Sequence, residues 1–346
     1  MAESNRQWLL RARPSGPLSL DDFEYREQAL PTTPLREGEV RIRNVAFLCA
    51  PTMRNWMDPP GNNFYPSIPL GEPIMAPAVG RVVASANEAF EIGDRVLALS
   101  SWQDYATLAT TSVRRPTKIP DGISFLDAIG RYGLNPLTAY FGLLEVGQPR
   151  EGETLVVSGA AGSTGSTVAQ IGKIKGLRVI GIAGGAEKCA WLTEQCGIDA
   201  SVDYKAGDVE QRLAELCPQG IDVFYDNVGG DILQAAVNNM APFGRIVLCG
   251  QISAYDGAEQ AQGLRNMMRL IYGSIRMQGF LCGTYADRFN EAIEALKAWT
   301  AVGRIVYRED LHQGFENLPS AFRTLFSGGN QGTLLVQIDD SGGDLR

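Results

Sequence analysis

From about residue 127 the chain alternates short apolar runs with helix-like segments. The apolar runs are GETLVVSG, GLRVIGIAG, IDVFYDNVG and GRIVLCG, and each one ends at a glycine or a turn. The helix-like segments between them are Ser166–Lys175, Ala186–Cys196, Val209–Cys217 and Asp231–Met240. Strands and helices that alternate at this spacing predict βαβ units and a parallel sheet. Near-continuous apolar strands are typical of a sheet that is buried on both faces.

The first 125 residues or so have a different pattern, rich in β-branched residues, glycine and proline. The segments EVRIRNVAFL, GRVVAS, RVLALS and QDYATLA read as short strands of an antiparallel, barrel-like domain. A helix over Leu318–Phe326 and a final strand over Thr333–Ile338 follow much later in the chain. Since that strand must join a sheet, we expect it to return to the β domain. The predicted domains are therefore 1–127 with 305–346, and 128–304.

The segment Ser158–Ser166, SGAAGSTGS, stands between a strand-like run and a helix-like run. Small residues let a backbone approach a pyrophosphate, and a helix N-terminus offers N–H groups and a positive dipole to it. The spacing is Ala160-x-Gly162-x-x-Gly165, with alanine at the first position of the G-x-G-x-x-G pattern. A structural turn is the alternative, but the βαβ context favours dinucleotide binding.

The end of the second strand bears on which dinucleotide binds. NAD-binding folds place an Asp or Glu there to hold the ribose 2′-hydroxyl. Here the segment reads GIAGGAEK, with Ala183-Gly184-Gly185 at the strand end and Lys188 close behind. Two glycines leave room for a 2′-phosphate and the lysine supplies positive charge, so we predict NADP(H). The alternative is that Glu187 faces the ribose and Lys188 is a solvated helix residue.

Charge and composition exclude several classes of protein. The net charge is −8, from 31 basic and 39 acidic residues, without basic clusters, which argues against nucleic acid or an anionic membrane surface as a partner. No segment approaches the roughly 20 apolar residues that a membrane span needs. The N-terminus lacks the apolar core of a signal peptide.

Cysteine and histidine usage indicates a metal-free protein of a reducing cytoplasm. The six cysteines are scattered without a C-x-x-C motif and read as buried thiols, with Cys49 the first candidate if one of them is reactive. The single histidine, His312, is expected in a surface loop as a solvated or capping residue. No set of close Cys and His residues predicts a zinc site.

Several motifs together resemble one family. They are GLNPLTAYFGLLEVGQPREGETLVVSGAAGSTGS, GIAGGAEKC, DNVGG, FGRIVLCGQISAY, RMQGFLCG and GFENLPSAF…GNQGTLLV. Their order and spacing resemble the zinc-independent medium-chain dehydrogenase/reductases, in the group of prostaglandin/leukotriene, alkenal double-bond and curcumin-type reductases. The resemblance implies a Rossmann doubly wound sheet and a discontinuous GroES-like β-barrel domain.

The resemblance also implies roles for residues. Ala161, Gly162, Ser163, Thr164 and Gly165 would bind the pyrophosphate, and Lys188 and Tyr204 the 2′-phosphate. The remaining cofactor contacts would be Asn227, Cys249, Ser253, Tyr255, Phe280, Leu281, Cys282 and Asn330. Thr52, Met53, Tyr65 and Asn135 would line the substrate pocket. Tyr204 and Asn227 could instead be turn residues, and Phe280 and Tyr255 packing residues.

The activity implied is NADPH-dependent reduction of the C=C bond of α,β-unsaturated ketones or aldehydes. Hydride goes to the β-carbon, an enolate forms, and Tyr255 or water protonates the α-carbon. A quinone reductase on the same fold and a non-catalytic NADPH-binding protein remain alternatives. An alcohol dehydrogenase is disfavoured because its zinc ligands are missing. The strand in RMQGFLCG resembles the one through which relatives form homodimers, although it could be an internal edge strand.

The chain departs from the family mainly around the substrate. The usual first-domain signature Asp-Pro-Tyr-Met-Arg is Ala50-Pro51-Thr52-Met53-Arg54, so Thr52 replaces a pocket tyrosine. The phosphate turn has Ser163-Thr164 where Ala-Val is common, and Asn135 stands where Pro or Gly is usual. These changes leave the cofactor prediction intact and put the identity of the substrate in doubt.

Overall fold

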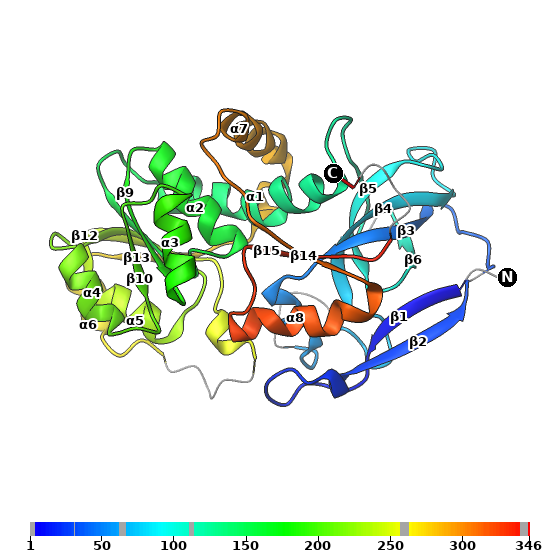
Figure 1. Ribbon diagram of the computed structural model, residues 1–346, viewed down its shortest axis with the longest axis horizontal. Coiled ribbons are helices and arrows are strands. Elements are labelled where there is room, and N and C mark those ends of the chain that lie inside the picture. Colours follow the sequence, from blue (N-terminus) through cyan, green and yellow to red (C-terminus); the bar gives the residue numbers. More distant parts are fainter. Residues whose placement is uncertain (1–3, 31, 62–66, 111–113, 257–262, 340–344) are drawn as a thin grey trace. The chain divides into compact units, whose positions relative to one another are not determined.

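The chain forms two compact units in the computed structural model, which describes all residues except 1–3, 31, 62–66, 111–113, 257–262 and 340–344 (Figure 1). Unit 1 consists of Met1–Gly133 together with Glu309–Arg346, and unit 2 consists of Leu134–Arg308. The first unit is discontinuous in sequence because the second is inserted into it.

Unit 2 is built on a six-stranded parallel sheet. Its strands are β8 (Thr154–Val157), β9 (Arg178–Ala183), β10 (Ala200–Asp203), β11 (Ile221–Asp226), β12 (Met240–Leu248) and β13 (Arg276–Gly279). The spatial order is β10-β9-β8-β11-β12-β13. Counted from β8, this is the order 3-2-1-4-5-6 of the Rossmann fold, so the predicted parallel, doubly wound sheet is confirmed.

Helices cover both faces of this sheet. They are α1 (Leu134–Phe141), α2 (Ser163–Ile174), α3 (Ala186–Glu194), α4 (Val209–Leu216), α5 (Gly230–Asn238), α6 (Met267–Tyr272) and α7 (Phe289–Ala301). Leu155 and Val179 point toward Gly172 of α2, whose missing side chain would overlap them. Their strand neighbours Val156 and Ile180 pack with residues of α4 and α5 on the other face. Alternating side chains of buried strands thus supply two cores.

The helix boundaries differ from the predicted ones in a way that matters for function. Helix α2 begins at Ser163 and not at Ser166, because Gly162 has the extended backbone of an N-cap. Ser163, Thr164 and Gly165 therefore belong to the first helical turn. Helices α3, α4 and α5 end one or two residues before the predicted ends, at Glu194, Leu216 and Asn238.

Unit 1 contains a seven-stranded mixed sheet and a separate two-stranded one. The larger sheet holds β3 (Glu39–Leu48), β4 (Met75–Ser85), β5 (Arg95–Ser101), β6 (Tyr105–Ala109), β7 (Thr117–Lys118), β14 (Glu309–Gln313) and β15 (Thr333–Gln337), and the smaller one β1 (Ser4–Leu10) and β2 (Phe23–Ala29). Strand β15 pairs antiparallel with β3. The predicted return of the C-terminal strand to the β domain is confirmed.

An aromatic core ties the C-terminal segment into unit 1. Helix α8 (Leu318–Ser327) places Phe322 edge-on against Trp102, with ring centroids 5.7 Å apart. Phe23 packs on the same indole at 5.8 Å, and all three side chains are buried. Such aromatic pairs add about 0.5–1.5 kcal/mol each to the gain from burial. Residues more than two hundred positions apart therefore share one core.

His312 lies in strand β14 and not in the loop that the sequence suggests. The strand is short and polar and lacks an apolar alternation, which is why the sequence does not reveal it. Its neighbour on the same strand face, Asp310, lies 3.1 Å from Nε2 of His312. The histidine is a partly exposed sheet residue.

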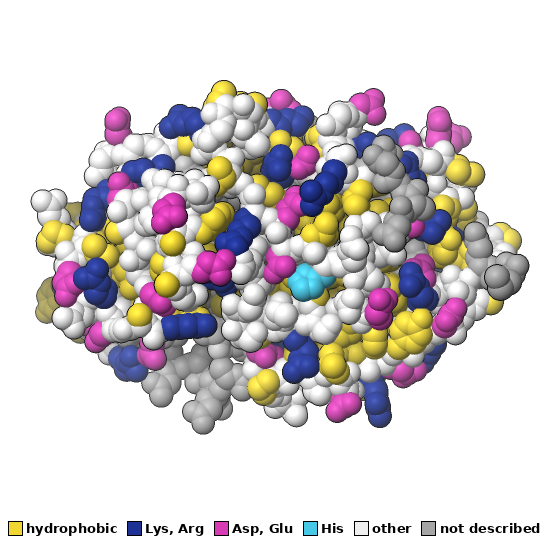
Figure 2. All heavy atoms as spheres, in the orientation of Figure 1, with side chains coloured by type: hydrophobic (Ala, Val, Ile, Leu, Met, Phe, Trp, Pro, Cys, Tyr) yellow, Lys and Arg dark blue, Asp and Glu magenta, His cyan; other side chains and the backbone are white. Residues whose placement is uncertain are grey.

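Acidic and basic side chains are interspersed on the face of the molecule seen in Figure 2, and among the described residues in view neither sign gathers into a single field. This distribution agrees with the modest net charge of −8.

Candidate functional site

The turn after β8 presents the N-terminus of α2. Gly159 has a positive φ of 57°, which glycine adopts without strain. The N–H of Gly162 donates to the carbonyl of Gly159 at 3.0 Å, and the N–H of Ala160 donates to Ile182 of β9 at 2.9 Å. The first N–H groups of a helix have no partners within the helix, so this end attracts anions.

Gly165 closes the turn against the strand end. A Cβ at this position would lie 2.3 Å from the carbonyl oxygen of Gly159 and 2.8 Å from Cα of Ala160. Both contacts are with backbone, which cannot move aside cheaply. The spacing Ala160-x-Gly162-x-x-Gly165 thus has a steric reason: the last glycine lets the helix begin directly over the turn.

Strands β8 and β11 are neighbours at the point where the strand order reverses, and hydrogen bonds join their carboxyl ends. Ser158 Oγ donates to Asp226 Oδ1 at 2.7 Å, and the N–H of Asn227 donates to Ser158 Oγ at 2.8 Å. The side-chain amide of Asn227 donates to the carbonyl of Ser158 at 2.7 Å. Ligands of doubly wound sheets bind at this reversal point. Asn227 therefore lies at the expected place and also holds the two strand ends together.

Asp226 is a buried carboxylate that the sequence analysis did not single out. It is 1 % exposed, and it accepts N–H groups of Val228 and Gly229 at 3.1 Å in addition to Ser158. Burial raises the pKa of the Asp226 carboxyl, and these three donors oppose the rise. Its position in the DNVGG motif could have indicated this role, because an Asp just before a glycine turn often accepts hydrogen bonds from the backbone N–H groups of that turn.

The turn from β9 into α3 is open at Gly185, whereas the space beside Gly184 is occupied by an aromatic ring. A Cβ on Gly184 would lie 2.7 Å from Cε1 of Tyr204, so this aromatic ring rests on the glycine backbone. Gly185 has a φ of 95° and caps α3, and a side chain there would meet open space. Lys188 is half-buried in the first turn of α3. Glu187, the alternative ribose partner, is ion-paired with Arg308 at 3.0 Å.

The loop after β12 carries the predicted proton donor. The hydroxyl oxygen of Tyr255 accepts a hydrogen bond from the N–H of Gln251 at 3.0 Å. Ser253 Oγ donates to the carbonyl of Val228 at 2.6 Å, which ties this loop to the end of β11. Cys249 begins the loop, and burial raises the pKa of its thiol to about 12. The thiol is therefore protonated at neutral pH.

The segment after β13 contributes a mixture of packing and exposed residues. The ring of Phe280 lies edge-on to Tyr225, with centroids 6.5 Å apart, and it covers Gly142, where a Cβ would come within 2.4 Å of it. Leu281 is exposed. Cys282 is buried, which raises the pKa of its thiol to about 11. Phe280 thus packs as a core residue would, and its contact with a nicotinamide stays a prediction.

The remaining predicted residues are spread over both units. Thr52 is exposed and Met53 is buried, both in the 3-10 turn Pro51–Met57 of unit 1. The amide of Asn330, also in unit 1, donates to the carbonyl of Gly332 at 3.0 Å. Asn135 is half-buried at the start of α1 in unit 2. Tyr65 lies outside the described residues.

The reactive-thiol alternative for Cys49 is wrong. Its side chain is buried in the core of unit 1, and burial raises the pKa of the thiol well above its ordinary value. A thiol that is buried and protonated is a poor nucleophile. All six cysteines are free. Among the residues that the structure describes, no three His, Cys, Asp or Glu side chains are grouped so that they could hold a metal ion.

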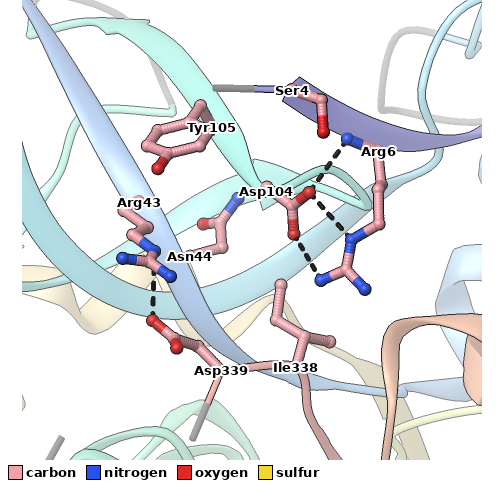
Figure 3. A pocket seen from close by; sticks show the side chains of 8 residues that line it. All are labelled: Ser4, Arg6, Arg43, Asn44, Asp104, Tyr105, Ile338 and Asp339. Atoms are coloured by element: carbon pink, nitrogen blue, oxygen red, sulfur yellow. Dashed lines mark hydrogen bonds and ion pairs between the residues drawn. The ribbon is translucent and has the colours of Figure 1, made fainter. Parts of the chain in front are cut away.

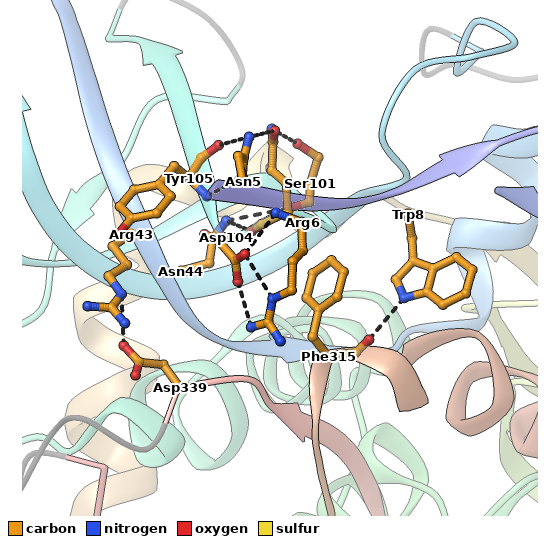
Figure 4. Close-up of polar contacts among 11 residues, drawn as sticks. Asn5, Arg6, Trp8, Arg43, Asn44, Ser101, Asp104, Tyr105, Phe315 and Asp339 are labelled. Atoms are coloured by element: carbon orange, nitrogen blue, oxygen red, sulfur yellow. Dashed lines mark hydrogen bonds and ion pairs between the residues drawn. The ribbon is translucent and has the colours of Figure 1, made fainter. Parts of the chain in front are cut away.

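A polar cavity of about 250 Å³ lies in unit 1, and none of the predicted site residues lines it (Figure 3). Its charged groups form pairs with one another. Asp104 binds the guanidinium of Arg6 through both oxygens, at 2.9 and 3.0 Å, and Asp339 lies 3.1 Å from Arg43. Figure 4 shows how Arg6 is also placed beside Phe315. Because these charges compensate one another, the cavity wall is a structural network of strands and the C-terminal segment.

The chain matches two domain models of known families. Residues 6–115 match a model described as the N-terminal domain of oxidoreductase, and residues 163–298 match one described as zinc-binding dehydrogenase. The NADPH-dependent curcumin reductase of Escherichia coli is 38% identical over 342 residues, which cover 97% of each chain. The NADP(+)-dependent 2-alkenal reductase of Nicotiana tabacum is 35% identical over 98% of this chain and 99% of its own.

A solved structure resembles the whole chain as well. The crystal structure of CurA from Vibrio vulnificus in complex with NADPH is 39% identical and has a TM-score of 0.89, over 97% of this chain and 99% of that one. The Rossmann sheet, its glycine turn and the discontinuous β unit define a nucleotide-dependent oxidoreductase fold. The chain belongs to the zinc-independent medium-chain dehydrogenase/reductases, in the group of the curcumin, prostaglandin and 2-alkenal reductases.

Proposed function

We propose that the protein is an NADPH-dependent reductase of the C=C bond of α,β-unsaturated ketones and aldehydes. The observation that carries this proposal is the turn Gly159–Gly165, in which backbone contacts exclude any side chain at Gly165 and a helix N-terminus is offered to a phosphate. The relatives named above as NADPH-dependent curcumin reductase and 2-alkenal reductase support the choice of cofactor and substrate class.

The residues at this end of the sheet fit NADP(H). The first turn of α2 would hold the pyrophosphate through Ala161, Gly162, Ser163, Thr164 and Gly165. Lys188 and Tyr204 would hold the 2′-phosphate; Gly185 leaves open space beside the turn, and Gly184 lets the Tyr204 ring lie against the backbone. The nicotinamide half would meet, within unit 2, Asn227, Cys249, Ser253, Tyr255, Phe280, Leu281 and Cys282.

The bound cofactor supplies a hydride to the β-carbon of the substrate. The chain's own part is to stabilise the negative charge that then develops on the carbonyl oxygen and to protonate the α-carbon. Tyr255 is our proposed donor for both tasks. A ribose hydroxyl of the cofactor is the other candidate for the first task, and water is the alternative for the second. The N–H of Gln251 donates to the Tyr255 oxygen and stabilises charge on it as the hydroxyl proton leaves. A donor aimed at such an oxyanion contributes about 3–4 kcal/mol in known enzymes.

Steady-state oxidation of NADPH tests this function. The purified protein is given simple enones, enals, aromatic propenones and quinones, and the products are identified. Formation of a saturated ketone or aldehyde supports the proposal. Turnover of quinones alone, with hydroquinone as product, would replace it by the quinone reductase alternative. If the protein binds NADPH but reduces none of the tested compounds, the non-catalytic NADPH-binding protein becomes the favoured alternative.

We further propose that the protein acts as a homodimer. Strand β13 lies at the edge of the parallel sheet, and helix α6 just before it buries none of its residues. Phe243, Ile271 and Tyr272 are 74%, 65% and 84% exposed. The N–H of Phe243 donates to Gly273, so these side chains belong to one region. Exposed apolar side chains beside a sheet edge that pairs with no further strand among the described residues favour contact with a second copy of the chain.

A cytoplasmic location is proposed on the six free thiols, which are typical of a reducing compartment. In the part of the chain that the structure describes, no helix has the length and apolar character needed to cross a bilayer.

A further inference from the structure

Asp203, the last residue of β10, joins two turns that lie next to each other at the carboxyl end of the sheet. Its Oδ1 atom accepts the N–H of Gly185 at 2.8 Å and the N–H of Lys205 at 2.9 Å. Gly185 caps α3 in the turn that leads to Lys188, and Lys205 follows Tyr204. One carboxylate oxygen therefore bridges the turn after β9 and the turn after β10.

The bridge matters because, among the described residues, the contacts of Tyr204 itself fix its ring only in part. The side chain is 43% exposed, and its ring rests on the backbone of Gly184, where a Cβ would lie 2.7 to 2.8 Å from three of its atoms. The N–H of Tyr204 donates to the carbonyl of Ala183 at 3.1 Å. The ammonium of Lys205 lies 5.9 Å from the ring centroid. Removal of the bridge would leave the two turns joined through Tyr204 by one backbone hydrogen bond and this ring contact.

Asp203 is bonded to the turn that leads to Lys188, and a carboxylate beside the proposed phosphate site would repel the ligand by its charge. The hydrogen bonds from Gly185 and Lys205 hold the pKa of the Asp203 carboxyl below its ordinary value, so the group is ionised at neutral pH. The repulsion between the Asp203 charge and a bound phosphate must therefore be offset by the better placement of the two turns that Asp203 joins.

We propose that Asp203 is a positioning residue that sets the preference for NADPH over NADH, by holding the Tyr204 ring and the α3 turn in the arrangement that receives the 2′-phosphate. The inference rests on the proposed function, since it concerns the same cofactor site. Asp203 acts through backbone N–H groups and needs no contact with the cofactor.

The matched variants are Asp203→Ala, Asp203→Leu and Asp203→Asn. The first two remove the acceptor. The third keeps an oxygen in the place of Oδ1, which accepts both N–H groups, and removes the charge. KM for NADPH and for NADH is measured for each, with one enone at saturation. We expect Ala and Leu to raise KM for NADPH about tenfold, the equivalent of one charged hydrogen bond, and to change KM for NADH less than about twofold. The Asn variant should keep the wild-type KM for NADPH or lower it.

Two results would overturn the inference. If Asp203→Ala and Asp203→Leu raise KM for NADPH and KM for NADH by the same factor, the substitutions damage the fold in general. If Asp203→Asn raises KM for NADPH as much as Asp203→Ala does, the effect comes from the lost charge and not from the lost acceptor. Lys188→Ala tests the proposed cofactor site itself. If neither Lys188→Ala nor Asp203→Ala changes the ratio of KM for NADPH to KM for NADH, the proposed cofactor site is wrong. If Lys188→Ala lowers the preference and Asp203→Ala does not, only the role of Asp203 fails.

Discussion

The hydroxyl of Ser158 and the carboxylate of Asp226, 68 residues apart in sequence, meet at 2.7 Å where β8 and β11 end side by side. Through this contact the phosphate turn that follows β8 and the DNVGG turn that follows β11 form one rigid edge. Asp226 also accepts the N–H groups of Val228 and Gly229, so a single buried carboxyl orders both turns. The geometry of the proposed cofactor site therefore depends on a residue that need not touch the cofactor.

Replacing Asp226 by alanine should destabilise the protein by roughly 3 kcal/mol, because buried donors on Ser158, Val228 and Gly229 lose their acceptor. Urea unfolding followed by circular dichroism measures the change. Asp231→Ala is the control: this carboxylate pairs with Arg265 on the surface and is 91% exposed, so its loss should cost less than about 0.5 kcal/mol. Equal effects of the two variants would contradict the assigned role.

The stability of Asp226→Asn relative to wild type should depend on pH. Burial raises the pKa of the Asp226 carboxyl in the folded state, so the folded protein holds this proton more tightly than the unfolded chain does. The group's contribution is fully present below the unfolded pKa of about 3.9 and is lost as the pH rises through the folded pKa. The difference in unfolding free energy, wild type minus Asn, should fall over that interval and then level off. A difference independent of pH would argue against a raised pKa.

Gly165→Ala should abolish NADPH binding, since the added Cβ would overlap the carbonyl of Gly159 at 2.3 Å and force the turn away from α2. Titration calorimetry with NADPH reports the loss. Gly207→Ala is a suitable control, because a Cβ there meets nothing within 4 Å and the backbone has no positive φ. Normal NADPH affinity in the Gly165 variant would place the phosphate elsewhere.

Lys188→Ala should raise KM for NADPH far more than KM for NADH, by about tenfold or more, because a charge-assisted contact to the 2′-phosphate is worth about 1.5–3 kcal/mol. Initial rates with both cofactors and one enone give the ratio. Lys175→Ala, a lysine beyond the C-terminal end of α2, serves as the control for lost positive charge. If both cofactors respond equally, Lys188 does not meet the 2′-phosphate.

Tyr255→Phe should lower kcat by about two orders of magnitude with little change in NADPH affinity, if the hydroxyl is the donor that the proposed function requires. The measurement is kcat for a simple enone together with Kd for NADPH. Tyr25→Phe removes a hydroxyl from a tyrosine of β2 that is 45% exposed and lies outside the proposed cofactor site, so it should have no effect. An unchanged rate would assign the proton to water and leave Tyr255 as a packing residue.

Much of the fold was predictable because periodicity reports burial directly. The apolar runs at β8, β9, β11 and β12 and the helices between them indicated a parallel sheet, and the structure has one in the Rossmann order. Strands β1, β2, β7, β10 and β14 were not predicted. In β14, for example, a polar strand carrying His312 gives no apolar alternation. The start of α2 was also misplaced by three residues, since Ser163 and Thr164 are acceptable in a loop as well as in a helix.

The sequence by itself determined the class of the protein, because the features that define this class are local and can be recognised in order along the chain. These features are the alternating strands and helices, the glycine turn Gly159–Gly165, and the glycines Gly184 and Gly185 where an NAD-binding fold would carry an acidic residue. Only the tertiary structure decided which polar residues hold that turn together. Ser158 with Asp226, and Asp203 with Gly185, are contacts between different strand ends. The physical reason is that hydrogen bonds act over about 3 Å in space, and only the sheet order determines which distant residues come that close.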